Sequence, residues 1–244
     1  MNQYWDILDS NTRDVLLNLR DAGLLKGFYL AGGTALVLSL GHRISVDLDL
    51  FTSKPAQTID SNSLVQRCID QFGERNVQID LNISDQLWLK LDRVEVMYLA
   101  YPYRHKYPLI TSDGVNLADV RDIALHKALA LGRRNAARDY IDIDYILRSE
   151  ITTLSQIVSD AGEVFNGKGE QTFSPRLFLQ QLAYTDDLND IESALHLVRM
   201  PDAFSDIAAR LARAAQTTFS ELVRPNHPDV EPSRPFTKNI HPDL

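Results

Sequence analysis

Within this 244-residue chain, the stretch 28–51 constrains the fold most strongly. It begins with a short apolar strand that stops at the pair Gly32-Gly33, and a helix-like run over 34–40 follows. The chain then turns back into a second apolar strand, 46–50. A strand that leads through two glycines into a helix and returns as a strand is typical of a sheet covered by helices, so we expect an α+β fold.

The second strand carries two acidic residues, Asp47 and Asp49. Because side chains alternate along a strand, both carboxylates are expected on one face, while Val46, Leu48 and Leu50 are expected to point into the core. Two acids on a strand are common at protein surfaces, so the pair alone is a weak signal. Neighbouring carboxylates repel each other, however, and a cation between them is the simplest reason for keeping both.

The glycine pair stands just before the helix, where a phosphate could bind. Glycine lets backbone N–H groups approach an anion closely, and the positive end of the helix dipole favours negative charge there. A phosphate cradle at Gly32-Gly33 and a cation site at the two aspartates would therefore lie on neighbouring segments. This combination predicts an enzyme that handles nucleotides.

Composition narrows the class of protein. The net charge of −8 argues against a general nucleic-acid binder, because such proteins are usually basic. The single cysteine, Cys68, excludes an intramolecular disulfide framework and suits a reducing compartment. The first residues lack the pattern of a signal peptide, and no apolar run approaches the roughly 18 residues that span a bilayer. We therefore expect a cytoplasmic protein with no membrane partner.

The rest of the N-terminal part alternates between helical and strand patterns, which predicts a small mixed sheet flanked by helices. The expected helices cover 3–26 and 61–72, and the expected strands cover 77–81, 87–91 and 94–99. A turn at Asp92-Arg93 is expected to join the last two strands. The aromatic and basic segment 101–108 is either a loop folded onto the sheet edge or a substrate contact, and the sequence leaves both open.

From residue 116 onward the pattern predicts a helical half. Its expected helices are 117–133, 136–149, 151–160, 175–184, 187–199 and 202–223, with a loop over 162–169. Half of the ten prolines follow Val223, which predicts an extended tail. We therefore expect a sheet-containing domain (1–115), a helical domain that completes the active-site cleft (116–223) and a Pro-rich tail (224–244).

A third carboxylate on a neighbouring strand would complete a metal site. Glu95 fits best, because it stands between Val94 and Val96 in an apolar run. Asp80 is the competing candidate and Asp92 a distant third. Each of them could equally be a strand residue that faces water.

The second half contains two further anomalies. Lys127 falls within an apolar helical stripe, so it either extends along the edge of the core or is held toward an anion. Asp139 and Asp142 lie three residues apart on one face of the next helix. Nearby arginines form a basic cluster that suits either a solvated helix end or a patch facing phosphate or RNA, namely Arg133, Arg134 and Arg138.

Together these blocks resemble the AbiEii/AbiGii toxin family, which belongs to the DNA-polymerase-beta-like nucleotidyltransferase superfamily. The resemblance covers about residues 25–150 and is vague beyond them. Its blocks are Gly-Gly-Thr-Ala-Leu, the run from His42 to Phe51, and the segments 122–127 and 138–142. It implies a nucleotidyltransferase-like mixed sheet flanked by helices and followed by a helical half.

The resemblance also implies an activity, which is transfer of an NMP from an NTP to an acceptor. The acceptor would be RNA, with tRNA the family-based expectation, or a protein hydroxyl. The cofactor would be Mg²⁺ or Mn²⁺, and the protein would act as the toxin of a type IV toxin–antitoxin or abortive-infection system with a cognate antitoxin.

The family motifs imply roles for individual residues. Nucleotide binding falls to Gly32, Gly33, Thr34, Arg43, Ser45 and Lys127; metal binding falls to Asp47, Asp49 and Glu95; catalytic roles fall to these three acids with Lys127 and Asp142. The family pattern is loose at the third acid, so the choice between Glu95 and Asp80 stays open.

Three rivals remain on the sequence alone. A glycosyltransferase also uses an Asp-x-Asp pair, and would transfer sugar rather than nucleotide. A haloacid-dehalogenase-type phosphatase carries a similar pair, but its surroundings differ from those of Asp47 and Asp49. A nucleotide- or partner-binding module of the same fold would bind NTP without turnover.

Overall fold

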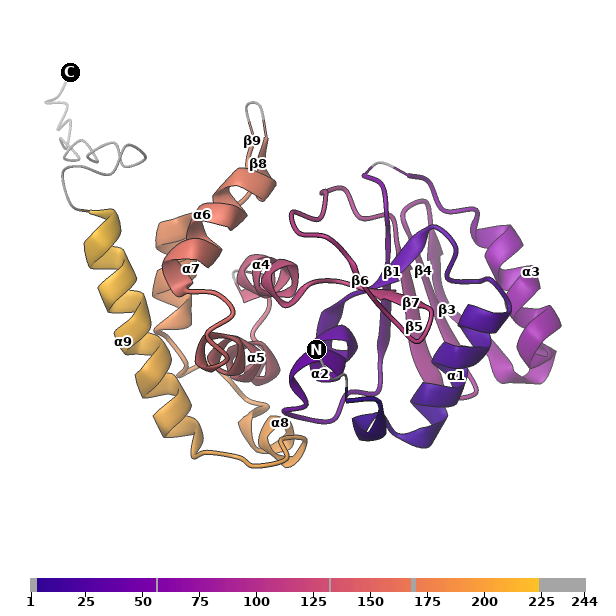
Figure 1. The fold of residues 1–244 in the computed structure, drawn as a ribbon, viewed down its shortest axis with the longest axis horizontal. Helices are drawn as coiled ribbons and strands as arrows, with labels where there is room; N and C mark the ends of the chain where they lie inside the picture. Colours follow the sequence, from indigo (N-terminus) through magenta and orange to yellow (C-terminus); the bar gives the residue numbers. More distant parts are fainter. Residues whose placement is uncertain (1–3, 56, 132, 168–169, 224–244) are drawn as a thin grey trace, which may run out of the picture.

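The computed structural model describes residues 4–55, 57–131, 133–167 and 170–223, and Figure 1 shows their arrangement. Within these residues, seven strands form one mixed sheet in the order β3-β4-β5-β2-β1-β7-β6. The strands are β1 (Phe28–Leu30), β2 (Leu48–Thr52), β3 (Val77–Ile83), β4 (Gln86–Leu91), β5 (Val94–Leu99), β6 (Ile110–Ser112) and β7 (Val115–Leu117). The central strand β2 runs antiparallel to β1 and parallel to β5.

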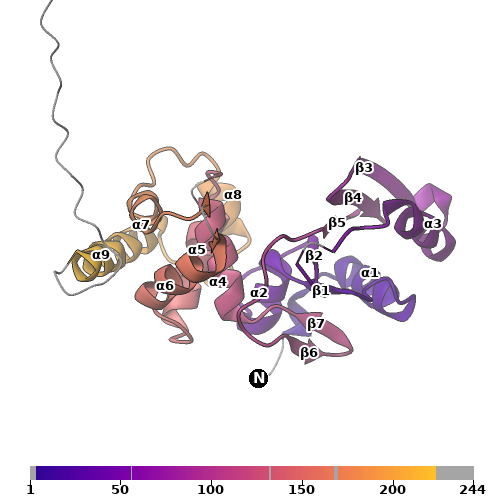
Figure 2. The same cartoon turned by 90° about the horizontal axis from the view of Figure 1, so that it is seen from above.

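Helices cover both faces of this sheet. Figure 2 shows α1 (Ser10–Asp21) and α3 (Ser61–Phe72) on one side, and α2 (Gly32–Leu40) on the other, next to the helical half. The helical half contains α4 (Val120–Leu131), α5 (Ala137–Arg148), α6 (Leu154–Phe165), α7 (Pro175–Leu182), α8 (Ile191–His196) and α9 (Phe204–Leu222). The remaining elements are short: 3₁₀ turns at Trp5–Ile7 and Glu74–Asn76, and the pair β8 (Asn166–Gly167) and β9 (Glu170–Gln171).

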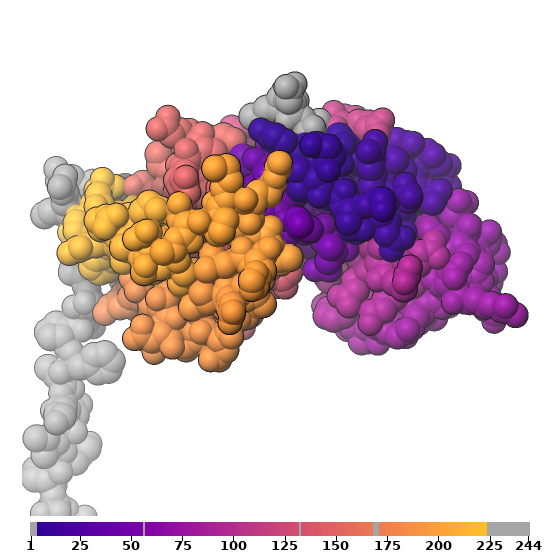
Figure 3. Space-filling model, turned by 90° about the horizontal axis from the view of Figure 1, so that it is seen from below, coloured from indigo at the N-terminus to yellow at the C-terminus, as the bar shows by residue number. Residues whose placement is uncertain are grey.

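The two halves meet along α2, which packs against both α4 and α5. On the face of the molecule seen in Figure 3, a hollow separates the orange helical half from the magenta region around β3–β5. Among the described residues, none of the helices combines the length and apolar character needed to cross a bilayer. The expected domain boundary near residue 116 stays a prediction, and the expected tail lies outside the described residues.

Local sequence signals explain where several of the helices begin and end. The Asp9 side chain accepts hydrogen bonds from the first N–H groups of α1, and Ser174 caps α7, which opens on Pro175. Helix α3 spans the residues predicted for it and ends at Gly73, whose φ is +82°. These helices therefore begin and end at residues that favour a helix boundary.

Three expectations about elements were wrong, and one pair of strands was not predicted. The single helix over 3–26 is a 3₁₀ turn followed by α1. Val46 is 47% exposed and precedes β2 instead of entering the core, because the strand pairs only from Leu48. Helix α6 continues through the first residues of the expected loop, and the hairpin β6–β7 was not predicted at all, since two three-residue strands leave almost no periodicity.

The aromatic segment 101–108 serves the fold. The ring of Tyr101 stacks on Phe51 at 4.6 Å between centroids. The carboxylate of Asp122 accepts the backbone N–H groups of Lys106 and Tyr107 at 2.8 and 2.9 Å. These contacts favour the interpretation of this segment as a loop folded onto the sheet.

The predicted turn at Asp92-Arg93 joins β4 to β5. Both residues have positive φ, 46° for Asp92 and 74° for Arg93, as a two-residue type I′ turn requires. Asn11 on α1 donates its side-chain amide to the Asp92 carbonyl at 2.8 Å and ties the turn to the body. The turn therefore holds its shape although neither residue is glycine.

Replacing Arg93 with glycine should raise the free energy of unfolding by about 1 kcal/mol, because glycine reaches positive φ without a Cβ clash. Valine at the same position should lower it, since a β-branched side chain tolerates this conformation least. Urea denaturation of the wild type and both variants measures the two effects. A glycine variant that is no more stable than the wild type would contradict the turn geometry.

Candidate active site

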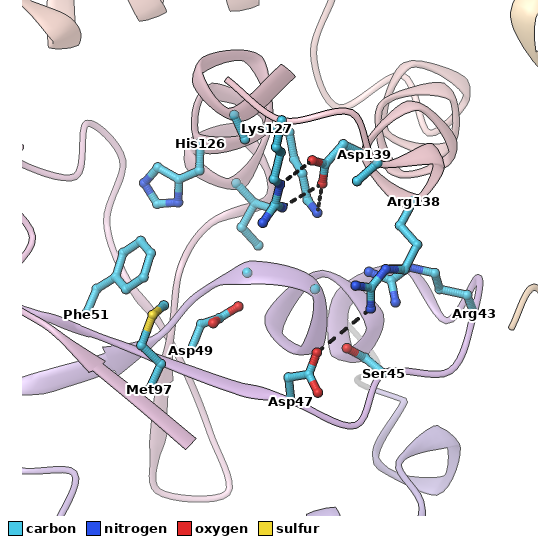
Figure 4. A pocket seen from close by; sticks show the side chains of 16 residues that line it. Arg43, Ser45, Asp47, Asp49, Phe51, Met97, His126, Lys127, Arg138 and Asp139 are labelled. Atoms are coloured by element: carbon cyan, nitrogen blue, oxygen red, sulfur yellow. Dashed lines mark hydrogen bonds and ion pairs between the residues drawn. The ribbon is translucent and has the colours of Figure 1, made fainter. Parts of the chain in front are cut away.

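A cavity of about 360 Å³ lies between β2 and the first two helices of the helical half. Figure 4 shows Asp47 and Asp49 on one wall and Lys127 with Asp139 on the wall opposite. Most of the predicted site residues line it, namely Gly32, Gly33, Arg43, Ser45, Asp47, Asp49 and Lys127. The other three, Thr34, Glu95 and Asp142, lie outside its lining.

The close contact between Gly32 and Asp49 brings the glycine turn to the carboxylate pair. Gly32 has a φ of +61°, and a Cβ built on it would lie 1.8 Å from Oδ2 of Asp49. Only glycine satisfies both the conformation and the space. This contact agrees with the expectation from the sequence that the glycine turn and the two aspartates are neighbours.

The start of α2 faces the same cavity without a side-chain cap. Its N-cap residue is Ala31, which cannot accept a hydrogen bond from the helix N–H groups. A Cβ on Gly33 would lie 2.5 Å from Nη2 of Arg43, so the guanidinium sits directly over the first turn. Free helix N–H groups and a guanidinium at one point form a site suited to an anion.

Thr34 and Ser45 brace this turn. The Thr34 hydroxyl donates to the carbonyl oxygen of Asp47 at 2.5 Å and lies 2.9 Å from Oγ of Ser45. Thr34 is buried, so its hydroxyl supports the segment that carries Asp47. Ser45 remains part of the cavity lining.

A fully buried carboxylate, Asp142, holds Arg43 in place. Its oxygens accept hydrogen bonds from Nε and Nη2 of Arg43 at 2.7 and 3.0 Å, and Nε2 of His42 lies 2.8 Å away. Burial acts to raise the pKa of Asp142, but Lys127 and Arg43 outweigh it and hold the pKa well below its ordinary value. Asp142 is thus a buried anion that positions the cations of the cavity.

Lys127 connects that buried cluster to the cavity wall. Its Nζ lies 2.7 Å from both Asp139 and Asp142. Burial acts to lower the pKa of Lys127, but these two carboxylates raise it above its ordinary value, so the ammonium stays charged. Arg134 also holds Asp139, with Nε at 2.8 Å. The three cations Arg43, Lys127 and Arg134 therefore share only two carboxylates, and this wall of the cavity keeps a net positive charge.

The aspartate pair lies opposite this wall. Burial raises the pKa of Asp49, and the charge of Asp47 adds to the increase although nearby cations oppose it. Arg138 comes within 3.8 Å of Asp47, as Figure 4 shows. A divalent cation would relieve the repulsion between the two carboxylates, and the space left by Gly32 lets Asp49 take its position.

Neither candidate for the third metal-binding acid forms a cluster with Asp47 and Asp49. The Glu95 side chain is 64% exposed and pairs with Lys90 at 3.7 Å; Asp80 pairs with the same lysine at 3.5 Å. Both acids line an adjoining cavity that also contains Asp47 and Asp49. In the described part of the chain, however, no three His, Cys, Asp or Glu side chains come close enough together to hold a metal. The third acid remains a prediction.

The far end of the cavity is apolar, and sequence reasoning assigned no role to the residues there. They are Phe51, Met97 and His126. Burial lowers the pKa of His126 to about 3, so its ring is neutral. Phe51 could have been found from the period of two after Asp49, whereas Met97 is recognised only from its pairing with Asp49 across β2 and β5.

The mixed sheet, the glycine turn and the carboxylate pair define a nucleotidyltransferase fold. A crystal structure described as a putative nucleotidyltransferase from H. pylori has this fold, with a TM-score of 0.53 at 16% identity over 87% of this chain and 95% of that chain. The structure of JHP933 from Helicobacter pylori is similar with a TM-score of 0.49 at 17% identity, covering 88% of this chain and 94% of that chain.

The sequence identifies the family. The model of the nucleotidyl transferase AbiEii toxin family, of type IV toxin–antitoxin systems, matches residues 14–225. The chain belongs to this family of nucleotidyltransferase toxins. An uncharacterized protein, aq_aa25 from Aquifex aeolicus (strain VF5), is 29% identical over 189 residues, which cover 75% of this chain and 85% of that protein.

Replacing Asp49 with asparagine should stabilise the protein at neutral pH. A folded-state pKa above the ordinary value means that the ionised carboxylate opposes folding, and this effect grows as pH rises through the folded pKa. The variant should therefore gain stability over the wild type at pH 7, and the gain should shrink as pH falls toward about 4. Thermal unfolding across this range measures it; a constant difference would contradict the pKa shift.

Replacing Asp142 with alanine should cost about 3–5 kcal/mol of unfolding free energy, because Arg43 and Lys127 would remain buried without their counter-charge. The lowered pKa of Asp142 means that its contribution is present above its ordinary pKa and is lost only as pH falls through the folded value. The loss should therefore be constant from pH 5 to 8 in urea titrations. The exposed Asp14 on α1, replaced in the same way, is the control and should change little.

Proposed function

We propose that this chain transfers an NMP from an NTP to an acceptor hydroxyl of RNA, with tRNA as the family-based expectation, and acts as a growth-inhibiting toxin. One observation carries the proposal: the contact of Gly32 with Asp49 joins an uncapped helix N-terminus to an acidic pair. A triphosphate and a divalent cation need these two features side by side.

The polarity of the cavity orients the donor nucleotide. Its cationic end, with the start of α2, Arg43 and Arg138, suits the triphosphate. Its apolar end, with Phe51 and the neutral ring of His126, suits a nucleobase. In this orientation the α-phosphorus lies over Asp47 and Asp49, between the two ends.

The donor set fits a divalent cation bound together with substrate. Mg²⁺ is commonly held by one or two carboxylates and completed by phosphate oxygens and water, so Asp47 and Asp49 would suffice once the triphosphate is present. Mn²⁺ takes the same oxygen ligands. Such an ion would supply charge neutralisation on the phosphates and activation of the acceptor hydroxyl.

The residues around it bind and orient the reactants. The acceptor oxygen attacks the α-phosphorus, the bond to the bridging oxygen of the β-phosphate breaks, and pyrophosphate leaves. Glu95, or else Asp80, is our candidate to accept the hydroxyl proton, since both share a cavity with the aspartate pair. Arg43 and Lys127 stabilise the charge that grows on the departing pyrophosphate.

Membership of a type IV toxin–antitoxin family supports a cognate antitoxin as a further partner. Nucleotide addition to a tRNA would block its use in translation, and this would explain growth arrest. Co-expression of the antitoxin would then restore growth. The cytoplasmic location expected from the sequence agrees with this role and stays a prediction.

The proposal is tested by incubating the purified protein with each α-labelled NTP, total tRNA and Mg²⁺ or Mn²⁺. Labelled tRNA is expected, and Asp47→Asn or Asp49→Asn should reduce labelling by at least about 10³-fold, because each removes a carboxylate that would hold the divalent cation against the reacting phosphates. The exposed Asp6, replaced by asparagine, is the control and should label normally.

Other outcomes identify the rivals. Binding of NTP without any labelled product under either metal would favour a binding module, and transfer from a nucleotide sugar would favour a glycosyltransferase. Undiminished labelling by both aspartate variants would remove the pair from the mechanism.

A further inference from the structure

A polar groove leads away from the aspartate pair along the edge of the sheet. Its first part, about 470 Å³, is lined by Asp47, Glu95, Arg138 and Arg93 among others. Its second part, about 700 Å³, shares Arg93 with the first and adds Arg75. The two parts also share Asn11, so the groove is continuous from the carboxylates to the outer end of the β4–β5 turn.

The two parts of this groove differ in charge: the first has Asp9, Asp47 and Glu95 beside Arg93 and Arg138, whereas the second has Arg75, Lys90 and Arg93 beside a single acid, Asp92. Arg75 and Arg93 are both exposed, and neither forms an ion pair with another of the described residues, whereas Lys90 beside them is held by Asp80 and Glu95. The chain carries a net charge of −8, so two unpaired guanidiniums at one groove run against its overall charge. The excess of basic side chains in the second part attracts an anionic ligand there.

The β4–β5 turn holds Arg93 in an unusual backbone conformation. Its φ of 74° favours glycine, and the turn is anchored through the Asp92 carbonyl instead of through the Arg93 side chain. The strained turn keeps this guanidinium at the point where both parts of the groove meet.

We propose that this groove binds the single-stranded end of the acceptor RNA, with backbone phosphates on Arg75 and Arg93 and the terminal hydroxyl passing Arg138 to reach Asp47. This inference rests on the proposed function and assigns the acceptor's path within it. Guanidinium groups bind phosphate through two parallel hydrogen bonds.

RNA fits this groove better than a protein acceptor does. Phosphates repeat along a strand, so one chain can meet both arginines and still extend to the reaction centre. The first part of the groove shares Asp47 and Arg138 with the cavity assigned to the nucleotide, but Gly32, Gly33 and Arg43 line only that cavity. Donor and acceptor therefore approach the aspartate pair from different cavities.

The test compares the Arg75→Ala/Arg93→Gly variant with the wild type in binding labelled total tRNA, without NTP, at several KCl concentrations. The variant should bind at least about tenfold more weakly at low salt, and the slope of log K against log salt should fall by about 1.4, or about 0.7 for each lost phosphate contact on a single strand. Its NTP affinity should be unchanged.

The matched control is Arg176→Ala/Arg213→Ala, which removes two exposed arginines from α7 and α9 and changes the net charge equally. It should bind tRNA as the wild type does. Because glycine relieves the strain at Arg93, weaker binding by the test variant cannot be attributed to unfolding, and thermal unfolding of the same sample checks this.

The inference is overturned if the wild type does not bind tRNA, if both double variants weaken binding equally, or if the label of the transfer assay enters a protein while tRNA stays unlabelled. Failure of the proposed function looks different. In that case tRNA binding would depend on the two groove arginines as expected, but no nucleotide would be transferred to it.

Discussion

The buried ion cluster around Asp142 is the interaction on which the rest of the site depends. It joins Arg43, which follows α2, to Lys127 on α4 through a carboxylate on α5, so it connects the sheet half to the helical half. The same junction is reinforced when Ile44 donates its N–H to the Leu197 carbonyl. A buried charge without partners is strongly unfavourable, so these groups must stay together whenever the protein is folded. The cavity is thereby held open with its cationic wall opposite the aspartates.

This arrangement separates the tasks of the charged residues. Asp142 is fully buried and acts through Arg43 and Lys127, whereas Asp49 lines the cavity and is available to a ligand. Their pKa values move in opposite directions, below the ordinary value for the surrounded carboxylate and above it for the one beside Asp47. Opposite pKa shifts of two groups of the same type are characteristic of functional sites.

The part of the site that could be predicted from the sequence is the part that depends on local periodicity. Asp47 and Asp49 follow from the period of two, and Gly32 from its place between strand and helix. Glu95 was assigned from an apolar run, but its distance from the pair depends on how β5 lies against β2, which no local pattern encodes. The ion-pair partners of Lys127 could not be predicted from the sequence either, because this ion pair depends on the packing of α4 against α5 and not on residue spacing alone.

Three residues in unusual local environments lie on one path through the molecule. Gly32 has a left-handed backbone against Asp49, the ionised Asp49 opposes folding, and Arg93 holds a conformation better suited to glycine. They follow one another from the start of α2 through the carboxylates to the groove. Natural sequences are otherwise locally consistent with their fold, so departures that line up in space mark a route for ligands more reliably than any one of them does. The sequence alone could not reveal this alignment, because β2 and the β4–β5 turn become neighbours only in the folded sheet.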